Sequence, residues 1–279
     1  MGVTKIEWTS TVSSDGTVAP GYTFNPWIGC TKVSDGCKFC YAETMMDKRY
    51  GKVKWGPTGE RVRTSDSNWA KPLAWDRKAL AEGRRYRVFC ASLADVFEDN
   101  PQVNPWRYDL FALIAKTPML DWLLLTKRPE NVNDMVPGQW RNVNRWPENV
   151  WIGTSVENQA MADKRIPELI KVPAQVRFLS CEPLLGPVDL ATWFWSAMTD
   201  DHKCAISWAI VGGESGPKAR PMDPDWARSL RGQCALAGVA FHFKQWGGVH
   251  KSETGRVLDG RTWDEYPQEY DYAAQPIAL

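Results

Sequence analysis

Residues 30–43 read CTKVSDGCKFCYAE and carry three cysteines, Cys30, Cys37 and Cys40, within eleven positions. The residues between the first two are mostly Thr, Lys, Ser, Asp and Gly types, which is typical of a loop rather than of a core. Three thiolates on one loop leave a cubane [4Fe–4S] cluster one protein ligand short, because such clusters normally take four. The spacing therefore predicts an iron–sulfur cluster with one iron open to a small molecule.

Two other interpretations of these cysteines stay open. Structural zinc is one, but zinc sites usually pair their ligands as C-x2-C or H-x3-H, and His202, His242 and His250 form no such pair. Three unrelated core cysteines are the other. Seven cysteines, an odd number with three of them clustered, argue against a secreted disulfide framework.

Length and composition favour one soluble domain over residues 1–279. Barrels built from β/α units commonly reach this length undivided, and 43% hydrophobic residues can supply a sizeable core. No apolar run approaches the 18 or so residues of a membrane span, and the start of the chain lacks the apolar segment of a signal peptide. We therefore expect a cytoplasmic protein with reduced thiols and no membrane partner.

Short apolar runs alternate with helical segments along most of the chain, and each run opens onto polar residues. This rhythm is the signature of parallel β/α units. It predicts a partial (β/α) TIM-type barrel of about six to seven mainly parallel strands, with the cysteines at the rim where the strands end. A doubly wound open sheet is the alternative, although a cysteine loop stands where its Gly-rich phosphate loop would be. The expected strands are 23–28, 87–91, 121–125, 150–153, 176–180, 206–211 and 239–243.

Two further segments extend this barrel. Residues 48–87 form an insertion after the first β/α unit with twelve Lys or Arg against four acidic residues, interleaved with aromatic residues. Such a pattern can grip phosphates and stack bases, although a solvated lid with inward-packed rings is an equal alternative. Residues 249–279 are expected to form a C-terminal extension with a small hairpin.

The polar residues after the strands are candidates for one shared site. A carboxylate there could accept hydrogen bonds from a ribose, and a Lys or Arg could pair with an acid group. Gly212 and Gly213 would let the backbone approach a ligand closely. The side chains expected at this rim are those of Asp95, Glu98, Lys127, Arg128, Ser155, Glu157, Ser180, Glu182, Glu214 and Lys244.

Long strings of the sequence resemble a known family. They are similar to the three-cysteine-motif phage proteins, which in turn resemble the radical S-adenosylmethionine (SAM) superfamily. The usual superfamily motif is C-x3-C-x-aromatic-C, so the spacing between Cys30 and Cys37 departs from it, whereas Phe39 fits the aromatic position. The matching strings are NPWIGCTKVSDGCKFCYAE (25–43), LLTKRPEN (124–131), GTSVEN (153–158), VRFLSCEPLLGP (176–187), IVGGESGPKARPM (210–222) and FKQWG (243–247).

This resemblance implies a [4Fe–4S] cluster held by the three cysteines, with SAM on the open iron. Phe39 is then expected beside the adenine. The superfamily's Gly-Gly-Glu string at the second strand is replaced here by residues 92–95, SLAD. The candidate cofactor-binding residues are Phe39, Ser92, Asp95, Ser155, Glu157, Ser180, Glu182, Gly212, Gly213 and Lys244, and the candidate catalytic residues are Lys127, Cys181 and Glu214.

The resemblance also implies an activity. In radical SAM enzymes a reduced cluster cleaves SAM, and the resulting 5′-deoxyadenosyl radical removes hydrogen from a C–H bond; flavodoxin or ferredoxin is the expected electron donor. Phage context and the basic segment suggest a modified pyrimidine in DNA as the substrate, modified or rearranged in the host cytoplasm. The alternatives are a radical SAM enzyme acting on a small molecule or peptide, and a cluster- or zinc-containing nucleic-acid-binding protein without turnover.

Overall fold

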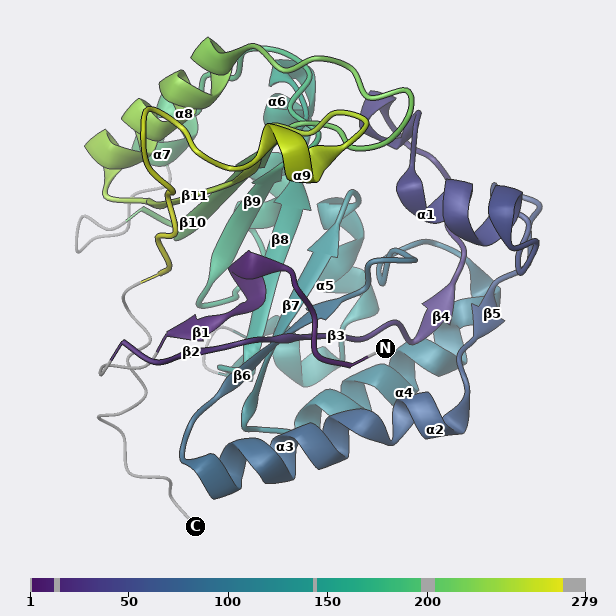
Figure 1. Ribbon diagram of the computed structural model, residues 1–279. Coiled ribbons are helices and arrows are strands. Elements are labelled where there is room, and N and C mark those ends of the chain that lie inside the picture. Colours follow the sequence, from purple (N-terminus) through teal and green to yellow (C-terminus); the bar gives the residue numbers. More distant parts are fainter. Residues whose placement is uncertain (1, 13–15, 143–144, 197–203, 268–279) are drawn as a thin grey trace.

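The chain is a mixed α/β protein whose seven-stranded sheet curls into a half barrel (Figure 1). The computed structural model describes residues 2–12, 16–142, 145–196 and 204–267. The strand order is β11-β10-β9-β8-β7-β6-β3, and every neighbouring pair is parallel. The strands are β3 (Tyr22–Thr23), β6 (Tyr86–Cys90), β7 (Leu120–Thr126), β8 (Val150–Ser155), β9 (Arg177–Cys181), β10 (Trp208–Gly212) and β11 (Ala240–Gln245). The expected parallel, curved sheet is confirmed.

Helices link these strands and cover the outer face of the sheet (Figure 1). Several begin and end where the sequence supplies caps: Asn158 accepts a hydrogen bond from Met161 N before α6, and Gly238 ends α8 in the left-handed conformation. The α-helices are α1 (Tyr41–Glu43), α2 (Asp66–Trp69), α3 (Lys71–Glu82), α4 (Asn104–Ala115), α5 (Val132–Met135), α6 (Gln159–Ile170), α7 (Ala191–Ser196), α8 (Pro224–Ala237) and α9 (Lys251–Thr254). None of these described helices is both long and apolar enough to cross a membrane.

Shorter elements complete the described chain. The 3-10 turns are η1 (Glu7–Thr9), η2 (Asp35–Cys37), η4 (Pro101–Val103), η5 (Pro129–Asn131) and η6 (Gly138–Arg141), and η3 (Thr44–Arg49) is a π-helical turn that continues α1. Two small antiparallel pairs lie outside the main sheet: β1 (Thr11–Val12) with β2 (Val18–Ala19), and β4 (Trp27–Ile28) with β5 (Val62–Arg63).

Alternation along each strand divides the apolar residues into two layers. Leu124 and Ile152 face outward and pack in the large core under the helices, whereas Leu123, Trp151 and Phe178 face into the curl. Successive strand residues point to opposite faces, so one apolar run serves both layers. The inner layer is rich in aromatic rings and fills the lower part of the half barrel.

The N-terminal segment closes the inner layer from the front. Figure 1 shows it, in purple, crossing in front of the sheet. Its Trp8 packs edge-on against Phe89 and Trp208, with ring centroids 4.7 and 6.2 Å apart. Because η1 contacts both β6 and β11, this segment spans the open side of the curled sheet.

The first strand differs from its expected extent of 23–28. In the main sheet it is short, covering Tyr22–Thr23, and the chain leaves the sheet at Asn25-Pro26. Residues Trp27–Ile28 pair instead with Val62–Arg63 in a separate antiparallel pair. Proline lacks the backbone N–H that would continue the hydrogen-bond ladder with β6.

The basic segment 48–87 is not one surface facing the strand ends, which corrects the expectation of a single lid. Its first part continues from the cysteine loop, and Trp55 lines the central cavity. Its second part forms α3, which packs on β6 and β7. Arg85 pairs with the buried Asp121 at 2.7 Å, and Arg87 is 9% exposed and donates to Ser10 O at 2.6 Å.

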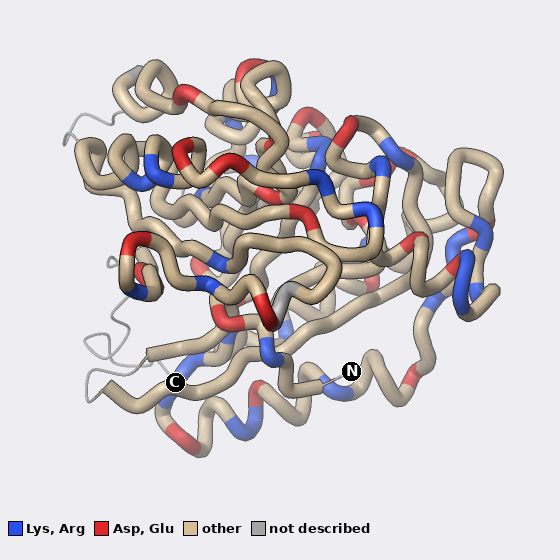
Figure 2. The backbone as a smooth tube through the Cα atoms, turned by 45° about the horizontal axis from the view of Figure 1, so that its top comes forward, with Lys and Arg blue, Asp and Glu red and all other residues tan. Residues whose placement is uncertain are grey.

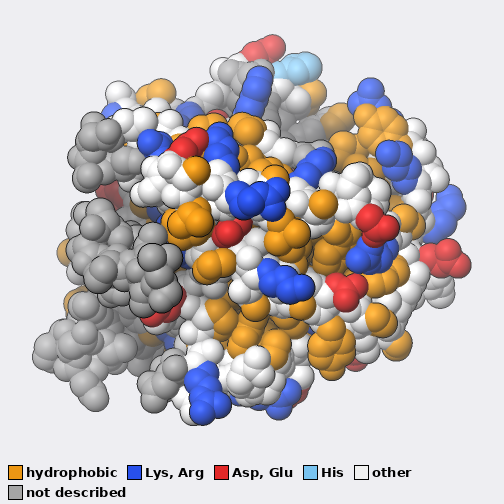
Figure 3. Space-filling model, turned by 90° about the horizontal axis from the view of Figure 1, so that it is seen from below, with side chains coloured by type: hydrophobic (Ala, Val, Ile, Leu, Met, Phe, Trp, Pro, Cys, Tyr) orange, Lys and Arg blue, Asp and Glu red, His pale blue; other side chains and the backbone are white. Residues whose placement is uncertain are grey.

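Charges of both signs are mixed along this segment. Figure 2 shows acidic positions among the basic ones, and in Figure 3 the face on the side of α3 carries basic, acidic and apolar side chains interspersed. The local excess of positive charge is therefore spread over two regions of the molecule, and no continuous basic groove covers α3.

The C-terminal extension contains α9 and a minimal form of the expected hairpin, with one two-residue turn at Asp259-Gly260. An isolated antiparallel bridge joins Leu258 to Arg261, and another joins Asp264 to His242 of β11. The Trp263 carbonyl accepts a hydrogen bond from Phe243 N at 2.9 Å, so this segment lies along the last strand. Residues 268–279 fall outside the described ranges.

Gly153 on β8 provides a test of the inner layer. An added Cβ there would lie 2.3 Å from Cε2 of Phe178, so Gly153→Ala should lower the free energy of unfolding by about 1–3 kcal/mol through overpacking. Gly232→Ala is the matched control, because nothing lies within 4 Å of its added Cβ. This change inside α8 should raise stability by roughly 0.5–1 kcal/mol. Urea denaturation of both variants measures the difference, and equal effects would contradict the packing described.

Candidate functional site

A cavity of about 580 Å³ opens at the carboxyl ends of the strands, beside the cysteine loop. All three loop cysteines line it, together with Phe39. The sequence expectation that the cysteines and the polar strand ends share one rim is therefore met. The other expected residues that line the cavity are Ser92, Asp95, Lys127, Arg128, Ser155, Ser180, Glu182, Gly213, Glu214 and Lys244.

The start of the cysteine loop is held by a buried ion pair. Glu98 accepts two hydrogen bonds from Arg61, at 2.7 and 2.8 Å, and a third from the backbone N–H of Thr31 at 2.8 Å. The side chains of Arg61 and Glu98 are 0% and 3% exposed. Arg61 also donates to Thr31 Oγ1 at 2.9 Å, so the insertion, the strand end and the loop meet at one bidentate pair.

A second buried carboxylate holds the middle of the loop. Glu157, at the end of β8, accepts from Arg165 Nη1 at 2.7 Å and from the backbone N–H of Gly36 at 3.3 Å. Both side chains of this ion pair are almost fully buried. The contact is close at Gly36, since an added Cβ would lie 3.0 Å from the Glu157 carboxyl carbon.

A third carboxylate acts through its arginine partner. Glu214, after β10, binds Arg220 in a bidentate pair at 2.7 and 2.8 Å, and Arg220 Nη2 donates to Asp35 O at 2.9 Å. Burial by itself raises the pKa of Glu214, but the hydrogen bonds from Arg220 outweigh it and lower that pKa below its ordinary value. The Arg220 guanidinium lies 5.3 Å from the centre of the Phe39 ring, which fixes the aromatic residue of the motif.

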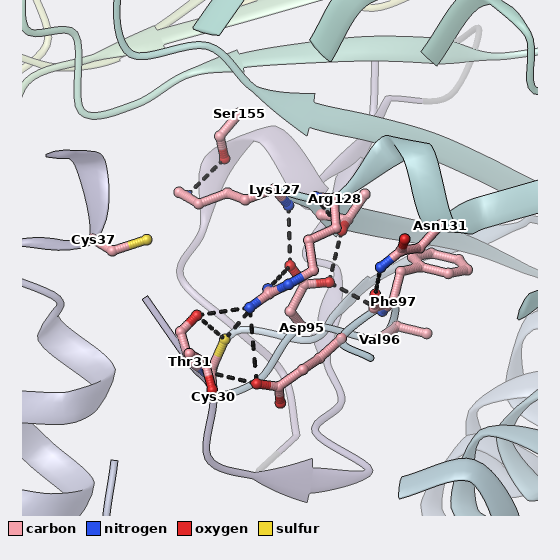
Figure 4. A network of polar contacts seen from close by, with 12 residues as sticks. Cys30, Thr31, Cys37, Asp95, Val96, Phe97, Lys127, Arg128, Asn131 and Ser155 are labelled. Carbon is pink, nitrogen blue, oxygen red and sulfur yellow. Dashed lines mark hydrogen bonds and ion pairs between the residues drawn. The ribbon is translucent and has the colours of Figure 1, made fainter. Parts of the chain in front are cut away.

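Arg128 connects the loop to Asp95, as Figure 4 shows. Its guanidinium donates to Asp95 Oδ2 at 2.9 Å and to Thr31 O at 2.8 Å, and it lies 3.8 Å from Cys30 Sγ. Burial, followed by the charges of Asp95 and Glu98, raises the pKa of the Cys30 thiol to about 12 despite this arginine. Without a metal, Cys30 is therefore a thiol at neutral pH.

Asp95 is a structural residue more than a ligand for a cofactor. Its two oxygens accept hydrogen bonds from Phe97 N, Thr126 Oγ1, Lys127 N and Arg128 at 2.7 to 3.1 Å. These four bonds use its acceptor capacity. Asp95 thereby fixes Arg128, and its expected role in SAM binding stays a prediction.

Lys127 and Lys244 line the cavity, and the ammonium group of each pairs with a neighbouring side chain. Lys127 Nζ donates to Ser155 Oγ at 2.8 Å (Figure 4). Lys244 Nζ, from β11, binds Glu182, at the end of β9, at 2.9 and 3.0 Å. Gly212 on the strand between them leaves the room for this pair, because an added Cβ would lie 2.5 Å from Glu182 Oε1.

Four of the residues expected at the rim or in the site do not line the cavity: Glu98, Glu157, Cys181 and Gly212. The Cys181 side chain points away from it into the outer core, because Ser180 takes the inward position on β9, and burial raises the pKa of the Cys181 thiol. Its proposed catalytic role is therefore abandoned, and the period-2 alternation of the strand could already have revealed its direction. Glu157 and Gly212 lie behind the lining and act through Gly36 and Glu182.

Other residues of the site were not anticipated. Arg61, Arg165 and Arg220 complete the buried pairs, and Ile6 and Trp8 form part of the cavity wall. Arg220 lies within the string IVGGESGPKARPM (210–222) quoted above, whereas no motif in the sequence marks the other four residues. The numbers of arginines and glutamates do not predict these ion pairs either. A buried ion pair differs from a surface ion pair only in its tertiary surroundings.

The donor set of the loop fits an iron–sulfur cluster. The loop cysteines are all free thiols, partly buried and in one cavity, and soft thiolate ligands suit such clusters. Within the described ranges no group of three or more His, Cys, Asp or Glu side chains is arranged so that it could hold a metal ion. In a cubane each thiolate binds its own iron, so the ligands need not converge on one point.

The buried pair at the start of the loop predicts a large stability effect. Arg61→Met would leave Glu98 buried without its partner, so the free energy of unfolding should fall by about 3–5 kcal/mol. Arg63→Met is the matched control, because Arg63 pairs with Asp66, whose side chain is 98% exposed; we expect a change within about 1 kcal/mol. Chemical denaturation of both variants measures the two changes in the free energy of unfolding. Similar losses of stability would show that the Arg61–Glu98 pair contributes no more than a surface ion pair.

The Cys30 pKa predicts a reactivity pattern in metal-free protein. Because the thiol pKa is raised to about 12, alkylation of Cys30 by iodoacetamide should be slow at neutral pH and should accelerate with increasing pH well beyond the ordinary cysteine value of about 8.5. Mass spectrometry of peptides containing Cys30 follows the modification. A half-maximal rate near pH 8.5 would contradict the burial and charge environment described.

Comparison with known proteins gives a family. A search of curated proteins found no match, and neither did a search of solved structures. A family model covers residues 3–267, which is most of the chain, and its description names neither an activity nor a cofactor. The chain therefore belongs to the family described as Protein of unknown function (DUF5131).

Proposed function

We propose that the protein is a radical SAM enzyme. The observation that carries this proposal is the convergence of the cysteine loop and the polar strand ends on one cavity large enough for a cofactor and a small substrate group. The seven parallel strands support it, because in TIM-type barrels functional residues collect at this end of the sheet. The finer assignment as a partial TIM-type barrel is part of the same proposal.

In this proposal the residues of the cysteine loop and their neighbours have different roles. Cys30, Cys37 and Cys40 would hold a [4Fe–4S] cluster, and Phe39, fixed by Arg220, would lie beside the adenine of SAM. When bound, the cluster would supply the electron that cleaves SAM and so produce the radical that removes hydrogen from the substrate. Arg128 would stabilise the Cys30 thiolate, because its charge lies 3.8 Å from Sγ and lowers the thiol pKa.

The remaining cavity residues would bind and orient SAM and the substrate. Lys127 offers an ammonium group that donates to the neutral Ser155 hydroxyl at 2.8 Å, so it suits a carboxylate of SAM or of the substrate. Ser92 and Ser180 offer hydroxyls. The apolar wall beneath them, with Trp8 and Phe89, excludes water from the reacting atoms.

A DNA substrate is the second candidate, and Trp55 supports it because this aromatic residue lines both the cavity and the basic region after η3. Lys48, Arg49, Lys52 and Lys54 are all exposed there. Arg84, Arg85 and Arg87 no longer support this candidate, because they lie beside the start of β6, at the opposite end of the sheet.

The proposed chemistry predicts the metal content. Protein purified without oxygen should carry about four irons, and Cys30→Ala, Cys37→Ala or Cys40→Ala should each abolish iron binding, because three protein ligands already leave the cluster one short. With a reductant, the wild-type protein should convert SAM to 5′-deoxyadenosine. Iron analysis and chromatography of the products measure both.

Cysteines outside the loop provide the controls. Cys204→Ala should keep its iron, since Cys204 does not line the cavity. Stoichiometric zinc without iron in the anaerobic protein would refute the proposal, as would a full iron complement that never cleaves SAM. The second result would leave a cluster-containing binding protein as the better description.

The DNA candidate predicts a salt dependence. If DNA binds near η3, the logarithm of the binding constant should fall with the logarithm of salt concentration by about 0.9 per phosphate contacted on duplex DNA. Lys52→Ala combined with Lys54→Ala should flatten this slope by roughly two units. Lys71→Ala combined with Arg77→Ala on α3 should leave it unchanged. Binding that ignores salt, or equal effects of the two pairs, would remove DNA as the substrate.

A further inference from the structure

The cavity has a second part that the cysteine loop does not form. Its floor is apolar: Trp8 and Phe89 belong to the inner aromatic layer, and Ile6 and Leu125 pack against that layer from above. Its polar groups come from β9 and β11, which lie on either side of β10 in the sheet. The two parts are continuous, so a ligand in the second part would sit beside whatever the cysteine loop holds.

The most prominent polar feature of this part is the Glu182–Lys244 ion pair. Lys244 Nζ lies 2.9 and 3.0 Å from the two Glu182 oxygens. The Lys244 side chain is 22% exposed and that of Glu182 is 13% exposed. The pair spans β10 because Gly212 has no side chain, and an added Cβ would lie 2.5 Å from Glu182 Oε1. Both residues line the cavity, so each charge can also face a ligand.

Most of the other charged groups of the cavity are paired with an opposite charge, and Lys127, which donates to the neutral Ser155 hydroxyl, is the exception. Asp95 and Arg128 bind each other, and Glu214 is held in a bidentate pair by Arg220. The Glu182–Lys244 pair therefore offers a carboxylate and an ammonium about 3 Å apart, above an apolar floor. A ligand that matches it carries a positive and a negative group side by side on an apolar body.

We propose that this part of the cavity binds an α-amino acid with an aromatic or aliphatic side chain. Its ammonium would bind Glu182, its carboxylate would bind Lys244, and its side chain would lie on Trp8, Phe89 and Leu125. Charge-assisted hydrogen bonds at both ends are stronger than neutral ones, and the partly dry site strengthens them further. The inference rests on the proposed function in one respect: it names the substrate class of the proposed enzyme.

Binding to cluster-free protein tests the inference without iron or SAM. L-phenylalanine is the probe, and its two analogues are phenethylamine, which lacks the carboxylate, and 3-phenylpropionate, which lacks the ammonium. Isothermal titration calorimetry should show binding of L-phenylalanine and a loss of at least about tenfold in affinity for each analogue, as expected when a charged partner is removed. Equal affinities for all three, or no binding of L-phenylalanine at millimolar concentration, would overturn the proposal.

Single variants assign each charge to its partner. Glu182→Gln should weaken the binding of L-phenylalanine and phenethylamine and leave that of 3-phenylpropionate unaffected or tighter. Lys244→Met should weaken the binding of L-phenylalanine and 3-phenylpropionate and leave that of phenethylamine unaffected or tighter. Lys171→Met, which removes an exposed lysine paired with Glu168, is the matched control and should change nothing. Loss of all three ligands in both variants to the same degree would mean that the pair has a structural role alone.

Gly212→Ala keeps the test valid if a charge variant fails to fold. Its Cβ would displace the Glu182 carboxylate, which is the end of a flexible side chain, without removing any charge. We expect it to weaken the ammonium-bearing ligands and to keep the unfolding midpoint near that of the wild type. Unchanged ligand affinities in this variant would count against the proposal. If this binding is found and iron or SAM cleavage is not, the amino acid site stands and the proposed function fails; the reverse result removes the site alone.

Discussion

The cysteine loop depends on buried carboxylates that are paired with arginines. Glu98, Glu157 and Glu214 each follow a different part of the sheet, and each reaches the loop backbone directly or through its arginine. An unpaired charge in such surroundings is costly, so each carboxylate depends on its own arginine. The loop is therefore placed by the sheet as a whole and not by its own sequence.

This arrangement changes the roles of the polar residues at the strand ends. Several carboxylates that suit a ligand in isolation are already saturated: Asp95 accepts four hydrogen bonds from the protein, and Glu214 is held by Arg220. What remains available to a ligand is a smaller set, in which Lys127 and the Glu182–Lys244 pair are the charged members. The carboxylates that are fully hydrogen-bonded within the protein hold the cysteine loop in place. The few polar groups that still have bonding capacity would select the ligand.

The lower part of the half barrel gives this rim a rigid base. Aromatic residues of four strands, β6, β8, β9 and β10, fill the curl, and Trp8 from the N-terminal segment closes it. Gly153 leaves space for the ring of Phe178, and Gly212 leaves space for the Glu182 carboxylate. The absence of a side chain at Gly153 thus allows the aromatic packing, and its absence at Gly212 allows the Glu182–Lys244 pair. Close packing of this kind transmits the position of the strands to the side chains at their ends.

The sequence by itself determined the parallel sheet, the order of its main strands along the chain and the meeting of the cysteines with the polar strand ends. These features follow from local periodicity and from the rule that parallel strands end at one edge. Tertiary structure alone decided the division of segment 48–87 and the arginine partners of the carboxylates. Arg220 and Asp35, for example, are 185 residues apart. A pairing between residues so distant depends on where the folded backbone brings them and on how well water is excluded there, and neither quantity is written in a local pattern.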